Sequence, residues 1–138
     1  MDLQKNLILS NVNVFEGDIL LCDSYVAEIA ASDVAKFSEN KSVYYFAPEL
    51  NHIDKLGFKL CTIFRLGRVT SLTVFTKDGS PHSLQIPLII QEAAEDVRFE
   101  KNKITYFVWE KSRIYQISDS TVRKARHLSE IESEKNDK

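Results

Sequence analysis

The chain has 138 residues, of which 43% are apolar and 28% are charged, and its formal charge is −2 at pH 7. These values are those of a water-soluble globular protein that can bury a core without disulfide bonds, and the weak negative charge argues against a general nucleic-acid-binding protein. No apolar run approaches the roughly 20 residues that a membrane-spanning helix needs.

Apolar residues at 7–9, 12 and 14 suggest a first strand, which would need a bulge or break at Ser10-Asn11. A short apolar run at 19–22 then predicts a buried strand. It ends at Asp23-Ser24, where either side chain can cap a helix. Apolar residues then recur at helical spacing over 25–37, which predicts the first helix. The β-branched residues of this segment leave a second interpretation open, in which residues 23–30 continue the strand.

An aromatic segment at 42–47 predicts the next strand, because aromatic and β-branched residues favour extended structure. A proline follows this segment at Pro48. Proline is favoured in the first turn of a helix, and glycine is favoured just after its end. We therefore predict a short helix between Pro48 and Gly57.

The middle of the chain is interpreted as three antiparallel strands with their turns. Apolar and polar residues alternate through 58–66, which is the period of a half-buried strand, and 69–76 is rich in β-branched residues. An Asp-Gly dipeptide then predicts a hairpin turn. Apolar residues at alternate positions complete the third strand at 84–90, and Pro87 places this strand at an edge or at a bulge because proline donates no ladder hydrogen bond.

Two strands and two helices are predicted in the last third of the chain. Residues 104–110 and 113–117 form a hairpin across a tight turn at 111–112. Residues 91–97 predict a short helix. A last helix carries an apolar residue at every third position up to Ile131.

Together these elements predict an α+β fold in a single domain over residues 1–131. The sheet would be predominantly antiparallel, built from a central meander at 58–90 and the hairpin at 104–117. About three helices would gather mainly on one face. Residues 132–138 would form a frayed tail, because they have nothing apolar to bury.

The two cysteines, Cys22 and Cys61, lie in separate apolar runs without a histidine at metal-site spacing. We interpret both as buried free thiols, in preference to a disulfide or a metal site. The first residues show no basic leader followed by an apolar run of signal length. The sequence therefore predicts a cytoplasmic protein.

Charge is distributed unevenly along the chain. Residues 1–40 carry a formal charge of −5, from two bases and seven acids, whereas residues 55–77 carry +5, from five bases and no acid. We interpret both as solvated faces, although such polarity can also orient two copies of a molecule. Bases at 111–126 lie near Trp109 and Tyr115, as in single-strand binding platforms, but the acidic tail argues against nucleic acid.

Few residues are candidates for catalysis. Glu49 and His52 have the spacing that places a carboxylate and an imidazole on one helix face, but no second such pair completes a metal site. Cys22 precedes a predicted helix N-terminus, which would stabilise a thiolate, but a buried apolar role is favoured. Ser80 and His82 are interpreted as surface residues beside a turn. We assign no catalytic residue, no metal ligand and no cofactor.

A sheet with helices on one face leaves the other apolar face for a partner to cover. We therefore predict a non-enzymatic, self-associating protein-binding module, such as a chaperone or an immunity-type inhibitor of one partner protein, with a homodimer as its assembly. The alternative is a small-ligand-binding protein or enzyme with a pocket between the sheet and the first helix. The candidate residues of the partner or ligand surface are Tyr25, Tyr45, Phe107, Trp109 and Tyr115.

Overall fold

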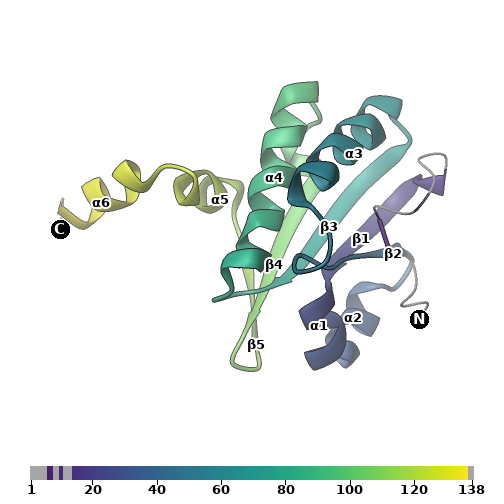
Figure 1. Cartoon of the computed structure of the whole chain (residues 1–138), viewed down its shortest axis with the longest axis horizontal. Coiled ribbons are helices and arrows are strands. Elements are labelled where there is room, and N and C mark those ends of the chain that lie inside the picture. The colour runs from purple at the N-terminus through teal and green to yellow at the C-terminus, as the bar shows by residue number, and fades with distance from the viewer. Residues whose placement is uncertain (1–5, 8–9, 11–13, 137–138) are drawn as a thin grey trace.

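The computed structural model describes residues 6, 7, 10 and 14–136. In this part of the chain, five strands form one sheet and helices pack against it (Figure 1). In chain order the elements are β1 (Gly17–Asp23), α1 (Ser24–Ile29), α2 (Ala31–Phe37), β2 (Ser42–Phe46), α3 (Ile53–Leu66), β3 (Val69–Lys77), α4 (Pro81–Val97), the short 3-10 helix η2 (Lys101–Lys103), β4 (Ile104–Glu110), β5 (Arg113–Ile117), α5 (Asp119–Ala125) and α6 (Leu128–Asn136).

The sheet has the strand order β2-β1-β3-β4-β5 and is mostly parallel. β1 pairs in parallel with β2 and β3, β3 pairs in parallel with β4, and the β4–β5 hairpin is antiparallel. The predicted α+β fold with a predominantly antiparallel sheet and about three helices is therefore wrong. The described residues form an α/β structure with six α-helices. The segments 58–66 and 84–90, which were predicted as strands, lie in helices α3 and α4. A helix that connects two strands of a sheet allows them to run parallel.

The helices cover both faces of the sheet and are not gathered mainly on one. The chain moves from β1 to β2 in one direction across the sheet, and from β2 through β3 to β4 in the other. Right-handed crossovers place the helices of these two movements on opposite faces. Accordingly, α1 and α2 pack on one face, whereas α3 and α4 lie side by side on the other (Figure 1).

The residues of β1 divide between the two cores that result. Leu20 and Cys22 belong to the apolar cluster that contains Val26 of α1. Ile19 and Leu21 belong to the larger cluster that α3 and α4 cover. Coverage on both faces explains why this strand is a continuous apolar run without alternation.

Segment 58–66, which was predicted as a strand, is part of helix α3. The apparent alternation is broken where two adjacent residues, Ile63 and Phe64, are both buried, and such a pair fits the wide apolar stripe of a helix. The predicted short helix ending at Gly57 is also wrong, because α3 begins at Ile53 and runs through this glycine. The helix ends at Gly67, whose φ of 71° is the left-handed conformation that glycine adopts easily.

Gly57 lies at the contact between α3 and α4. A Cβ atom at this position would meet Ile89 Cγ1 at 2.7 Å and Cδ1 at 2.9 Å. The missing side chain therefore lets the two helices approach closely. The ring of Phe64 stacks on that of Phe99 with centroids 4.2 Å apart, which extends the contact to the end of α4.

Segment 84–90, which was predicted as a strand, lies inside helix α4, and the predicted helix at 91–97 is the second half of the same element. The helix begins with strong signals, because the Ser80 side chain accepts a hydrogen bond from the Ser83 N–H and a proline occupies the first turn. Pro87 lies inside the helix and has no N–H to donate to the carbonyl of Ser83. Its ring is buried on the side of the helix that faces the sheet.

The structure confirms the predicted strands at 19–22, 42–47, 69–76, 104–110 and 113–117 within one or two residues. The predicted turn at 111–112 joins β4 to β5 with a φ of 49° at Lys111 and 66° at Ser112, the two positive values of a type I′ turn. The predicted first helix is helical but divides at Ala30 into α1 and α2, and the last helix divides into α5 and α6.

The two edges of the sheet differ. Along β2, the Leu7 N–H donates to the Tyr45 carbonyl at 2.8 Å, and Asn6 forms a bridge with the same residue. Along β5, four of five residues are exposed, and no further strand pairs with it among the described residues. Beyond β5, α6 extends away from the sheet and buries none of its side chains (Figure 1).

Helix α6 includes residues 132–136 of the predicted tail, and residues 137–138 lie outside the described residues, as do most residues of the predicted strand at 7–14. In the part of the chain that the structure describes, no helix is both long enough and apolar enough to cross a membrane.

Candidate functional site

The carboxyl ends of β1 and β3 meet where the winding of the chain reverses. From these ends, α1 leaves toward one face of the sheet and α4 toward the other. In open α/β sheets, such a switch point forms a crevice at the carboxyl edge, and ligands commonly bind there. The carboxyl edge at β1 and β3 is therefore a candidate ligand site.

Asp23, the last residue of β1, fills this crevice with its own side chain. One carboxyl oxygen accepts the N–H of Val26 at 2.8 Å, and the other accepts the N–H of Lys77 at 2.8 Å. The residue is completely buried. Burial raises the pKa of the Asp23 carboxyl above its ordinary value of 3.8, and the hydrogen bonds from Val26 and Lys77 oppose this shift only in part.

Ser83 of α4 lies close to the same carboxyl. Its hydroxyl is near enough to lower the pKa of Asp23, yet the buried Oγ has no direct hydrogen-bond partner among the described residues. We therefore regard the interaction as electrostatic and not as a hydrogen bond of ordinary length. Because Asp23 already takes the N–H groups that face the crevice, an anionic ligand would find few free donors at the switch point.

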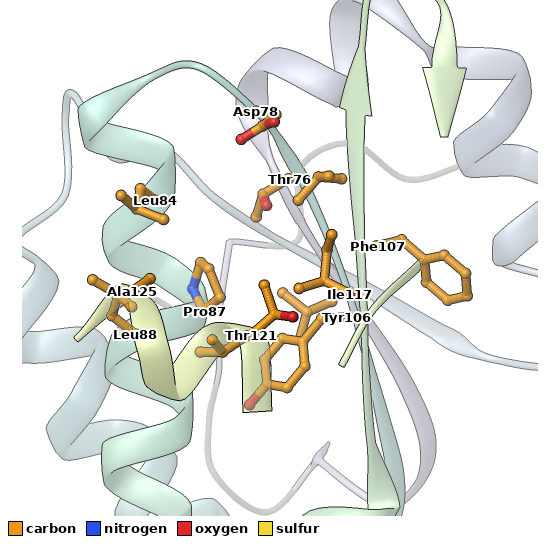
Figure 2. Close-up of a pocket in the computed structure, with 13 residues that line it drawn as sticks. Thr76, Asp78, Leu84, Pro87, Leu88, Tyr106, Phe107, Ile117, Thr121 and Ala125 are labelled. Carbon is orange, nitrogen blue, oxygen red and sulfur yellow. The ribbon is translucent and has the colours of Figure 1, made fainter. Parts of the chain in front are cut away.

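A cavity of about 250 Å³ lies on the side of β3 that is turned away from β1, between α4, α5 and the β4–β5 hairpin (Figure 2). Helix α4 contributes Leu84, Pro87 and Leu88 to its lining. Helix α5 contributes Thr121, Val122 and Ala125. The sheet contributes Val74, Thr76, Tyr106, Phe107, Val108 and Ile117, and Asp78 follows β3 at the rim.

The lining of this cavity, called the α4–α5 cavity below, is mainly apolar. Its polar side chains are those of Thr76 and Asp78 at one end, Thr121 on α5 and Tyr106 on β4. Figure 2 shows the Tyr106 hydroxyl pointing away from Thr76 and Asp78, so that the ring forms part of the wall. The Phe107 ring points out of the cavity on the other side of β4. The arrangement can hold an apolar molecule with hydrogen bonding at its rim.

Helix α5 is held against α4 by a polar network. The side-chain amide of Gln91 donates to the backbone carbonyl of Asp119 at 2.9 Å and to its carboxyl at 3.0 Å. Arg126 donates to Gln91 Oε1 at 2.9 Å, and Arg123 donates to Glu95 at 2.6 Å. The cavity thus lies beneath a helix that side-chain hydrogen bonds and ion pairs keep in place.

A second cavity, of about 380 Å³, lies at the carboxyl ends of β1 and β2. Its lining includes Tyr25 and Glu28 of α1, Tyr45 of β2 and Glu49 of the following loop. The Glu49 carboxylate lies near enough to the Tyr25 hydroxyl to raise its pKa. The structure therefore brings Tyr25 and Tyr45, two of the predicted surface residues, into one cavity beside the first helix, here called the α1 cavity.

The other three predicted surface residues lie elsewhere. Phe107 and Trp109 of β4 pack against the cluster beneath α1 and α2, and the Phe107 ring lies 4.6 Å from that of Phe37. Tyr115 pairs with Val108 across the hairpin and so points to the opposite face, where it is 46% exposed. The five predicted residues are thus divided among three places.

The residues considered for catalysis are also separated. Glu49 precedes α3, and His52 occupies its N-cap position without a side-chain capping hydrogen bond, so the pair does not share a helix face. Both cysteines are free, and burial together with the charge of Asp23 raises the pKa of the Cys22 thiol, which disfavours the reactive thiolate. Among the described residues, no group of three or more His, Cys, Asp and Glu side chains could hold a metal ion.

Two features of this edge were not predicted from the sequence. Asp23 was identified as a possible helix cap, but its second hydrogen bond, to β3, depends on the parallel pairing of β1 with β3. The only available signal was an acidic residue at the end of an apolar run. The α4–α5 cavity requires that residues 81–97 form a helix, and it could not be predicted from a strand interpretation of 84–90.

No protein-family model matches the chain, and no curated protein or solved structure is significantly similar to it. The function is therefore argued from the residues of the site and not from a relative.

Proposed function

We propose that this protein binds a small, mainly apolar molecule in the α4–α5 cavity. The observation that carries the proposal is a mainly apolar cavity of about 250 Å³ whose few polar side chains are those of Thr76, Asp78, Tyr106 and Thr121. Small-molecule sites have this character, with an apolar lining and a few polar groups that orient the ligand. The proposal concerns binding, because the lining offers no paired nucleophile and base.

The volume limits the size of the ligand. Drug-sized ligands occupy cavities of roughly 300–1,000 Å³, and an apolar cavity of about 150 Å³ holds benzene. A cavity of about 250 Å³ therefore suits a bicyclic aromatic compound or a short acyl chain. Asp78 at the rim disfavours a ligand with a carboxylate at that end.

The experiment combines native mass spectrometry of the purified protein with thermal unfolding in the presence of indole and 1-octanol. A ligand at about 100 times its Kd stabilises the folded state by about 2.7 kcal/mol, which raises the melting temperature. The Ala125→Leu variant should lose this response, because Ala125 lines the cavity. Ala35→Leu, at an exposed position of α2, is the matched control. If Ala125→Leu responds like the wild type to both compounds, the ligand does not occupy this cavity.

Self-association as a protein-binding module is a second candidate, and the open edge of β5 favours it. An unpaired edge strand presents a row of free N–H and C=O groups that can pair with another strand. Pairing of two β5 strands across a two-fold axis would join two sheets and cover Ile114 and Tyr115, which are 38% and 46% exposed. The earlier reason for expecting a partner, an uncovered sheet face, no longer applies.

Light scattering combined with size-exclusion chromatography tests this second candidate. We expect a dimer mass for the wild type and a monomer mass for Tyr115→Lys, because an added charge on an edge strand opposes edge-to-edge pairing. Phe58→Lys is the control, since Phe58 is exposed on α3. This helix connects β2 to β3 and does not adjoin β5 in the chain, and β2 and β5 are at opposite ends of the strand order. A monomeric wild type would end the self-association proposal and leave ligand binding unaffected.

A cytoplasmic location belongs to the same proposal. Both thiols are unpaired, as is usual where glutathione and thioredoxin keep cysteines reduced. Fractionation of cells that produce the tagged protein would test the location, and recovery from a membrane or secreted fraction would contradict it.

A further inference from the structure

The α1 cavity is distinct from the site proposed above. It lies on the other side of the switch point, between the start of α1, the end of β2 and the loop that leads to α3. Its volume of about 380 Å³ is sufficient for a small organic molecule. Its lining includes Tyr25, Glu28, Tyr45, Ala47, Glu49 and Leu50.

The electrostatic character of this cavity is negative. Glu28 and Glu49 are its charged lining residues, and no lysine, arginine or histidine lies among the described residues that line it. The nearby Glu49 carboxylate raises the pKa of Tyr25 to about 12, and desolvation and the charge of Asp23 add to that shift. An anion placed here would be repelled, whereas a cation would be attracted.

The N-terminus of α1 does not reverse this character. Ser24, the first residue of the helix, lines the cavity. However, the carboxyl of Asp23 accepts the N–H of Val26, so the partial positive charge of the helix end faces an internal anion.

Two tyrosine rings complement the carboxylates. Tyr45 is only 6% exposed and is held in the core, and Tyr25 of α1 is half-buried. The face of a tyrosine ring attracts ammonium groups within about 6 Å of its centre. Rings and carboxylates in one cavity are therefore suited to a cation whose charge is spread over carbon-bound groups.

We infer that the α1 cavity binds a small organic ammonium ion. A metal ion is a poorer occupant, because Ca²⁺ takes six to eight oxygen ligands and Mg²⁺ keeps a tight octahedral shell. The described residues contain no group of three or more acidic, histidine or cysteine side chains that could supply such ligands. A neutral ligand would gain no charge–charge attraction from Glu28 and Glu49, both of which are exposed.

The direct test titrates the isotopically labelled wild-type protein with choline and with its neutral isostere 3,3-dimethylbutan-1-ol, followed by amide chemical shifts. Choline should shift the signals of residues around Tyr25, Tyr45 and Glu49 with a Kd of about 1 mM or tighter. The neutral isostere should leave these signals in place. Equal shifts with both compounds, or no shift with choline, would overturn the inference without reference to any variant.

Variants then assign the interaction to the lining. The double variant Glu28→Gln with Glu49→Gln keeps the side-chain shapes and should weaken choline binding about tenfold, since both attractive charges are removed. Tyr25→Leu should weaken it by a similar factor through loss of the ring face. Glu39→Gln, at an exposed position outside the cavity, is the control and should bind like the wild type. Unchanged affinity in the double variant would contradict the proposed site.

Discussion

Two regions flank the carboxyl end of β3, and they differ in what fills them. On the side of β1, the buried Asp23 carboxyl bridges α1 and β3 through two hydrogen bonds. On the side of β4, the α4–α5 cavity is lined mainly by apolar side chains. The same edge of one sheet thus carries a crevice closed by an internal carboxyl and a cavity that a ligand can enter.

The lengths of the connections account for the difference. Helix α1 begins at Ser24, directly after Asp23, so the last residue of β1 must also cap the helix. A loop of three residues, 78–80, separates α4 from the end of β3, and Ser80 of this loop caps the helix. With its own cap, α4 starts farther from the strand end, and the space beside it remains available. Where a helix follows its strand directly, as α1 does, the capping side chain fills the switch point. Where a short loop comes between them, as before α4, space for a ligand remains beside the strand end.

The largest effect is expected from Asp23→Ala. The substitution removes a helix cap, worth about 1 kcal/mol, and leaves the partly buried N–H of Lys77 without its acceptor, which costs about 1–3 kcal/mol. We expect the free energy of unfolding in urea to fall by about 3 kcal/mol. Asp96→Ala is the control, because this exposed carboxyl near the end of α4 should contribute almost nothing. Equal losses in the two variants would show that Asp23 does not hold α1 and β3 together.

A smaller loss is expected from Val122→Ala, on the cavity side of the comparison. Val122 is the buried residue of α5 and contributes to the wall of the α4–α5 cavity. Deletion of its methyl groups should lower the free energy of unfolding by about 2 kcal/mol. The enlarged cavity should also take up indole more readily, in contrast to the loss expected for Ala125→Leu. A variant that is destabilised but takes up no more indole would indicate that α5 collapses onto the sheet.

The pH dependence of stability tests the electrostatics of the closed side. Burial raises the pKa of Asp23 in the folded state above 3.8, so ionisation of this group costs stability as the pH rises from about 4 through the folded-state pKa. The wild type should therefore lose stability relative to Asp23→Asn, which does not titrate, as the pH increases across this window. The measurement is urea unfolding of both proteins at several pH values. A wild type that gains relative to the asparagine variant would show that the two N–H donors outweigh the cost of burial.

The smallest effect is expected from Arg126→Met in the network that holds α5. Arg126 donates to Gln91 and lies 3.4 Å from Glu95, but this carboxylate is 40% exposed, and partly solvated ion pairs contribute less than about 1 kcal/mol. Global stability should change little, while amide hydrogen exchange in α5 becomes faster. Unchanged exchange would mean that the apolar contact of Val122 alone keeps the helix in place.

The strands were predictable from the sequence because their signals are local. Each of these strands has a composition that is unusual for a helix. The residues of β1 are mainly apolar, those of β2 include several aromatic residues, and those of β3 are rich in β-branched residues. The two central helices were not predicted, because a dense apolar segment satisfies both periods at once. In α4, Ile86 and Ile90 are two steps of a strand face and also one turn of a helix. The Ser80 cap and the following proline favour a helix at this position, and in the structure these signals prevail over the apolar alternation.

Part of the site could be predicted for a related reason. Tyr25 and Tyr45 lie at the carboxyl ends of β1 and β2, two strands that follow each other in the chain, and βαβ winding brings such positions together. Trp109 and Tyr115 were grouped because both are aromatic and near one hairpin. The register of that hairpin pairs Trp109 with Ile114 and Tyr115 with Val108, so the two side chains point to opposite faces. The register follows from the two-residue turn, and the separation could have been deduced from the sequence.

The close approach of α3 to α4 also limits how this sequence can drift during evolution. A methyl group at position 57 would lie 2.7 Å from the Ile89 side chain, so the space between the helices at this point can hold only one of the two groups. A larger residue at 57 is compatible with the same helix spacing only when residue 89 becomes smaller. In any set of sequences that keep this fold, these two positions should vary together, although they lie far apart in the chain.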